Sequence, residues 1–131
     1  MISLSREQVK RLHRMQLDAT GGLDGIRDEA ALDSALSAAF QTIRGVDLFP
    51  STVAKIARTA YGLIRNHPFV DGNKRIGTFV MLVLLELNHI EVDFSDDDII
   101  RTGMEIASGN MTDKQLHDLI LALGKEAKQG G

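Results

Sequence analysis

Apolar residues recur at helical spacing along most of the chain. The spacing places successive apolar side chains on one helix face in the segments 9–17, 32–40 and 53–64. The segment 72–89 is apolar on nearly every side past Gly77, which is typical of a helix buried in the centre of a domain. The pattern therefore predicts an all-α fold, a bundle of helices around a buried central helix.

Residues typical of helix ends divide this pattern. Ser5 and Asp28 are suited to cap the first two helices, and Ser95 to cap the fifth. The third should end at Asn66, because a residue that precedes a proline is disfavoured in the α region. We expect the last helix to reach about Lys125. The predicted helices begin at about Ser5, Asp28, Ser51, Gly72, Ser95 and Thr112.

Composition narrows the class of protein. A chain of 131 residues, 44% apolar and 25% charged, is expected to form one folded domain, here 1–126, with 127–131 as a disordered tail. The chain has no cysteine, its N-terminus becomes charged too early for a signal peptide, and no apolar run is long enough to span a bilayer. We therefore expect a cytoplasmic protein without membrane contact.

Charge points to a small local site. The net charge of −3 argues against direct binding of nucleic acid, whose partners are usually basic. Within the stretch HPFVDGNKR, residues 67–75, two adjacent cations and a histidine face a single carboxylate. A positive site of this size suits a small anion better than a duplex.

The residue types in this stretch fit phosphate chemistry. If the central helix starts there, its first N–H groups are free to bind an anion, and Gly72 lets the backbone approach a phosphate closely. Lys74 and Arg75 add positive charge. Asp71 offers a hard oxygen ligand for Mg²⁺ beside phosphates, and His67 can take a proton near neutral pH.

Structural alternatives exist for the same residues. Asp71 is also a good N-cap, and capping alone is the common role of an Asp-Gly pair before a helix. Phe69 and Val70 are expected to anchor the core, and the remaining histidines, His13, His89 and His117, to be surface or core residues. The combination in fixed order favours function, since capping needs neither a histidine nor paired cations.

The stretch resembles the signature HxFx[D/E]GN[G/K]R of the Fic/Doc family. The residues at its defined positions are His67, Phe69, Asp71, Gly72, Asn73, Lys74 and Arg75. The segments GGLDGIRDEAALDSAL and FQTIRGVDLFP are also similar to short death-on-curing (Doc) toxins of this family. The resemblance implies a Fic/Doc fold over nearly the whole chain.

The family also implies a role for each motif residue. His67 would be the general base for a hydroxyl of a partner protein, and Asp71 would hold Mg²⁺. Gly72 and Asn73 would form the anion hole, and the catalytic Arg75 would steady negative charge on the nucleotide. All of these follow from the resemblance and not from spacing.

Lys74 selects between two branches of the family. Fic enzymes that transfer AMP mostly carry glycine there, whereas Doc toxins carry lysine and present the γ-phosphate of ATP. Thr78, in place of a second family arginine, also fits Doc. The resemblance thus implies a protein kinase that phosphorylates elongation factor Tu and arrests translation. The alternatives are an AMP transferase and a catalytically silent Fic-fold binding module.

We expect the activity to be inhibited by a separate protein. Doc toxins are silenced by an antitoxin of the prevents-host-death type, and this sequence has no clean copy of the inhibitory motif [ST]xxxE[GN]. The nearest segment, 20–25, has aspartate for glutamate on a glycine-rich loop. The segment 40–50 lies where the family has a target-docking flap, a loop or hairpin, which would hold the target's hydroxyl segment beside His67. A simple surface loop is the alternative.

Overall fold

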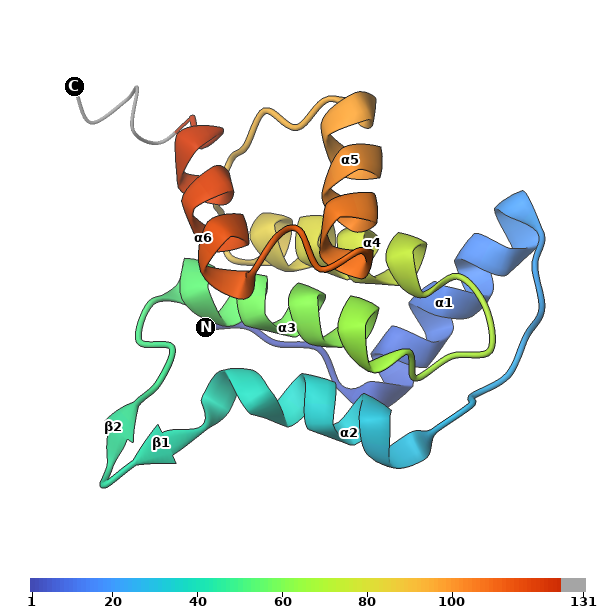
Figure 1. Cartoon of the computed structure of the whole chain (residues 1–131), viewed down its shortest axis with the longest axis horizontal. Helices are drawn as coiled ribbons and strands as arrows, with labels where there is room; N and C mark the ends of the chain where they lie inside the picture. Colours follow the sequence, from blue (N-terminus) through green and yellow to red (C-terminus); the bar gives the residue numbers. More distant parts are fainter. Residues whose placement is uncertain (126–131) are drawn as a thin grey trace.

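The computed structural model describes residues 1–125 and is almost entirely helical (Figure 1). The α-helices are α1 (Arg6–Thr20), α2 (Glu29–Ser37), α3 (Thr52–Asn66), α4 (Asn73–Leu87), α5 (Asp96–Ala107) and α6 (Asp113–Ala122). A 3₁₀ turn, η1 (Ala38–Phe40), and two short strands, β1 (Thr42–Ile43) and β2 (Val46–Asp47), lie between α2 and α3. The all-α prediction is confirmed. The tail predicted at 127–131 lies outside the described residues.

Side chains cap the helices much as the sequence predicts. Each cap accepts the backbone N–H of the residue three positions on, and the caps of α1, α5 and α6 form full capping boxes. The capping side chains are Ser5, Asp28, Ser51, Ser95 and Thr112. Helix α4 differs, because its N-cap is Gly72 and no side chain caps it. The first N–H groups of α4 are thereby left for another partner.

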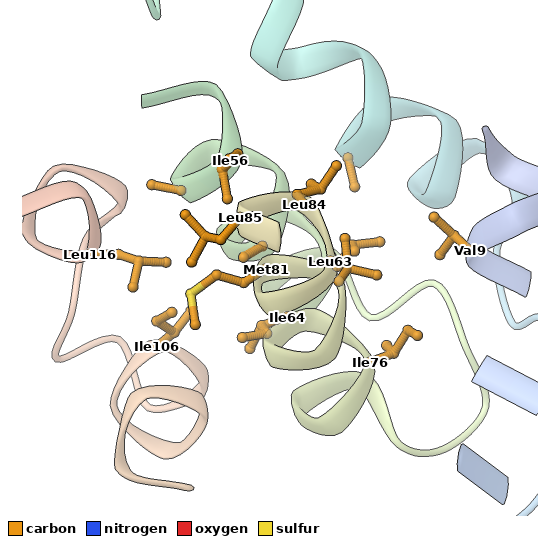
Figure 2. Close-up of a cluster of buried hydrophobic side chains, with 14 of the residues drawn as sticks. Val9, Ile56, Leu63, Ile64, Ile76, Met81, Leu84, Leu85, Ile106 and Leu116 are labelled. Carbon is orange, nitrogen blue, oxygen red and sulfur yellow. The ribbon is translucent and has the colours of Figure 1, made fainter. Parts of the chain in front are cut away.

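Helix α3 takes the central place in the fold. It contacts α2, α4, α5 and α6, whereas α4 contacts α1, α3 and α5. Side chains from most of these helices meet in one apolar cluster (Figure 2). Helix α4 is not buried all round, because Phe79 and Leu82 are only partly buried and Leu87 is exposed.

A glycine allows α3 and α4 to pack closely. A Cβ atom added at Gly77 of α4 would lie 2.4 Å from Cγ1 of Ile64 on α3. Both residues are in the core, and Ile64 is fully buried. The close approach fixes the C-terminal end of α3 beside the N-terminal end of α4, where the motif lies.

The segment 40–50 forms the hairpin β1–β2. Arg44 and Gly45 both have positive φ, as a tight two-residue hairpin turn requires. Lys55 in the first turn of α3 contacts Asp47 at 3.2 Å. The hairpin therefore lies at the N-terminal end of α3 and His67 lies at the other end (Figure 1). A helix of 15 residues puts about 20 Å between them, so the hairpin does not sit beside His67.

The last helix is shorter than predicted. It ends at Ala122 instead of about Lys125, because the following backbone pairs with the segment after α4. Asp93 N–H donates to Leu123 O at 2.9 Å, and Lys125 N–H donates to Glu91 O at 2.9 Å. No helix within residues 1–125 is long and apolar enough to cross a bilayer.

Candidate active site

The motif forms the connection from α3 to α4 and lines a cleft. The cleft has a volume of about 430 Å³, and its walls are residues 67 and 70–75 together with Ala107 of α5. The predicted site residues are thus brought together on one surface. Phe69 is buried, as predicted, whereas Val70 is half exposed and lies on the cleft wall instead of in the core.

His67 is exposed at the end of α3, with its backbone in the left-handed region at φ 49 and ψ 55. This conformation is uncommon for a residue with a Cβ. Its carbonyl oxygen accepts a hydrogen bond from Arg27 Nε at 2.6 Å, and Arg27 Nη2 donates to Asn66 O at 2.9 Å. Arg27, which the motif does not include, therefore holds the helix end that carries the histidine.

Asn73 is buried and its side chain points into the motif loop. Its Oδ1 accepts from Phe69 N–H at 3.0 Å, and its Nδ2 donates to Phe69 O at 3.0 Å and lies 3.3 Å from His67 Nδ1. The side-chain amide of Asn73 is therefore fully used within the loop. Only its backbone N–H is free to bind an anion.

The same contact bears on the histidine tautomer. Because an amide nitrogen only donates, the neutral ring of His67 here accepts at Nδ1 and carries its proton on Nε2. A base acting through Nε2 needs the other tautomer. The 3.3 Å contact with Asn73 is long for a hydrogen bond, and such contacts commonly rearrange when substrate binds.

Asp71 lies on the rim of the cleft and does not cap α4. Its Oδ2 accepts from Leu23 N–H at 3.2 Å and its Oδ1 from Gly72 N–H at 2.8 Å. The bonds from Leu23 and then Gly72 hold the pKa of Asp71 below its ordinary value of 3.8. The capping alternative is thus wrong: the helix starts one residue later, and the carboxylate stays ionised at the cleft.

The first turn of α4 has free backbone donors of the kind that bind anions. Gly72 has φ 79 and ψ 20, a left-handed conformation that turns the chain into the helix. The backbone N–H groups of Asn73, Lys74 and Arg75 donate to no acceptor within residues 1–125. These free groups and the positive end of the helix dipole point toward the cleft. The exposed side chain of Lys74 adds a positive charge at the same place.

Arg75 is engaged by the end of α1. Its Nη1 donates to Thr20 Oγ1, and its Nη2 lies 3.4 Å from Gly21 O. The loop after α1 thus contacts both Arg75 and Asp71. The guanidinium must exchange these neutral partners for a phosphate if it is to bind nucleotide.

Two further residues support the site and were not predicted to do so. His13 of α1 is buried, stacks on Phe69 with ring centroids 3.9 Å apart, and its Nε2 lies 2.8 Å from Asp71 O. Arg65 of α3 donates to Ala107 O at 3.0 Å and so holds the end of α5 at the cleft wall. Neither contact has a signal in the sequence, because the partners are far apart along the chain.

Comparison with known proteins agrees with this geometry. Residues 3–85, more than half of the chain, match the model of the Fic/DOC family. The chain belongs to this family. Toxin Doc of Mycolicibacterium smegmatis is 37% identical to it over 81 residues, which are 60% of this chain and 62% of that protein. The match thus spans less than two thirds of the relative's length. The family prediction from the motif 67–75 is confirmed.

Metal chemistry at the cleft would depend on one side chain. No group of three or more metal-ligating side chains occurs in the part of the chain that the structure describes. Mg²⁺ at phosphate sites is commonly held by one or two carboxylates, substrate phosphates and water. The ionised carboxylate of Asp71, next to free N–H groups, fits this kind of site.

Proposed function

We propose that this protein is a Doc-like toxin that transfers the γ-phosphoryl group of ATP to a threonine or serine hydroxyl of a protein. The observation that carries the proposal is the arrangement at one cleft of an exposed histidine and an uncapped helix N-terminus bearing Lys74. The fold, the family and the similarity to Toxin Doc support it.

In the proposed reaction the hydroxyl oxygen of the target attacks the γ-phosphorus. The new O–P bond forms as the bond between the γ-phosphorus and the β,γ-bridging oxygen breaks, and ADP leaves. His67 takes the hydroxyl proton. The free N–H groups of Asn73 to Arg75 and the ammonium of Lys74 stabilise negative charge on the phosphate oxygens.

Mg²⁺, when bound beside Asp71, would neutralise phosphate charge. The carboxylate is prepared for this role, because its hydrogen bonds to Leu23 and Gly72 leave lone pairs on both oxygens. Removal of Mg²⁺ by a chelator should abolish transfer.

The nature of residue 74 favours phosphoryl transfer over AMP transfer. An AMP transferase of this family needs room at this position for the β- and γ-phosphates, and it mostly carries glycine there. Lys74 has a long, charged side chain where those enzymes have none, and its ammonium is a suitable partner for a terminal phosphate. AMP transfer remains the second candidate, because the rest of the motif is shared.

The target and the partner follow from the Doc resemblance. We propose elongation factor Tu as the phosphorylated protein and an antitoxin of the prevents-host-death type as the inhibitor. A silent binding module is the less favoured alternative, since a pure binder needs no ionised carboxylate and exposed imidazole at one anion site.

Parallel reactions with two forms of labelled ATP test the proposal. Elongation factor Tu, Mg²⁺ and the protein are incubated with ATP labelled either in the γ-phosphate or in the adenine. Transfer of the γ-label alone supports the kinase. Transfer of the adenine label would establish AMP transfer, and transfer of neither would refute this choice of target.

A further inference from the structure

Arg27 contacts three successive carbonyl groups at the end of α3, although it lies outside the motif. Its Nε donates to His67 O at 2.6 Å and its Nη2 donates to Asn66 O at 2.9 Å. Its backbone N–H donates to Pro68 O at 2.8 Å. One residue therefore holds the backbone before, at and after the histidine.

The chemistry of the helix end explains why an outside donor is needed. The last carbonyl groups of a helix have no donors within the helix, and the N–H groups at and just after a left-handed residue satisfy carbonyl groups about one turn earlier. The carbonyl groups of Asn66 and His67 lie past that turn, so their donors must come from another segment. The guanidinium of Arg27 supplies two donors, and its charge lies at the negative end of the α3 dipole.

The same contacts bear on where the imidazole lies. The left-handed backbone of His67, with φ 49, directs its side chain toward the first turn of α4, where Nδ1 lies 3.3 Å from Asn73 Nδ2. That conformation is costly for a residue with a Cβ and persists only where the surroundings hold it. Without Arg27, the long contact with Asn73 would remain to hold the ring.

We propose that Arg27 is a positioning residue for the base of the reaction: it holds the left-handed backbone of His67 and thereby keeps the imidazole beside the anion site. This inference rests on the proposed function. It assigns to Arg27 an effect on the rate of transfer and not on the binding of ATP, because its guanidinium contacts backbone carbonyls and not the cleft.

Two substitutions and a matched control test this role. Arg27→Ala removes the guanidinium, and Arg27→Lys keeps a charge but cannot place two forked donors on two carbonyls. Arg11→Ala is the control, because Arg11 is an exposed arginine of α1 whose side chain makes no hydrogen bond or ion pair within residues 1–125. Circular dichroism spectra and melting curves establish that each variant is folded.

The kinetic expectation separates positioning from binding. Both variants of Arg27 should lose at least about tenfold in kcat, since a small displacement of a catalytic group is costly, with KM for ATP within about twofold of wild type. Guanidinium ion, added far below denaturing concentrations, should restore part of the activity of Arg27→Ala but leave Arg11→Ala and His67→Ala unchanged. Wild-type kcat in both Arg27 variants would overturn the proposal. If Arg27→Ala fails to fold, Arg27→Lys carries the kinetic test.

A structural readout keeps this inference separate from the proposed function. If the wild-type protein transfers no phosphate, the proposed function fails, and the inference is then tested by NMR. A left-handed residue gives a strong cross-relaxation signal between its own N–H and Hα protons. His67 should show this signal in the wild type and lose it in the folded Arg27 variant. An unchanged signal would contradict the positioning role.

Discussion

Replacing Gly77 by alanine tests the contact that sets α3 against α4. The added Cβ would lie 2.4 Å from Ile64 Cγ1, 2.9 Å from Ile64 Cδ1 and 3.2 Å from Ala60 O. Ile64 is fully buried and the third atom belongs to the backbone, so relief requires repacking. Overpacking costs about 1–3 kcal/mol, and alanine regains about 1 kcal/mol in helix propensity. Because the contact is far inside van der Waals distance, we expect the upper end of the cost and a net loss of about 2 kcal/mol.

Gly103 of α5 provides a matched control. A Cβ there would lie 3.5 Å from Lys74 Cβ and 3.6 Å from Thr78 Cγ2, which are ordinary contacts. Gly103→Ala should therefore be neutral or stabilise by up to about 1 kcal/mol. Urea titrations followed by circular dichroism give both free energies of unfolding. If Gly77→Ala proved as stable as wild type, the close packing of α3 on α4 would be wrong.

Three other predictions concern single contacts. The N–H of Ser95, and then its hydroxyl, lower the pKa of Asp98 below its ordinary value of 3.8. The ionised carboxylate therefore stabilises the fold at pH values above 3.8, and this contribution is lost as the pH falls through the pKa of the folded state. Asp98→Asn should accordingly show a shallower decline of the unfolding free energy in urea titrations between about pH 5 and about pH 2; an equally steep decline would contradict this. Asn73→Ala leaves the buried N–H and C=O of Phe69 without these partners and should cost about 2–4 kcal/mol in the same assay, whereas wild-type stability would show that the side chain does not hold the loop. Arg65→Ala removes a donor from the last carbonyls of α5 and should cost about 1 kcal/mol, with faster amide exchange in the last turn of α5 if the contact holds that turn, and unchanged exchange if it does not.

Local features of the fold could be predicted from the sequence. Helix starts such as Ser5, Asp28 and Ser95 are set by side chains that bond to backbone only three residues away. The motif is likewise local, since nine consecutive residues bring the histidine, the carboxylate and the helix N-terminus together. The role of Asp71 was the exception. Asp71 and Gly72 could each be the N-cap of α4, and Gly72 is the N-cap because the loop after α1 binds the carboxylate of Asp71.

The contacts that hold the site could not be predicted, because they join distant segments. Arg27 and His67 are 40 residues apart, and His13 and Asp71 are 58 apart. Neither the periodicity of apolar residues nor the spacing within a motif indicates a contact between such distant residues. The expectation that the hairpin lies beside His67 was wrong for a related reason. The hairpin is attached directly to the first turn of α3, and the sequence does not show that this turn lies far from the motif.

Phosphoryl transfer by this protein can be measured as the mass of elongation factor Tu after incubation with the protein, ATP and Mg²⁺. We expect a gain of about 80 Da, one phosphoryl group, on a single serine or threonine located by peptide mapping. The gain should disappear with His67→Ala and persist with Arg11→Ala. A gain equal to the larger mass of an adenylyl group would show AMP transfer instead of phosphoryl transfer. A phosphoryl gain that His67→Ala does not reduce would show that His67 is not the base.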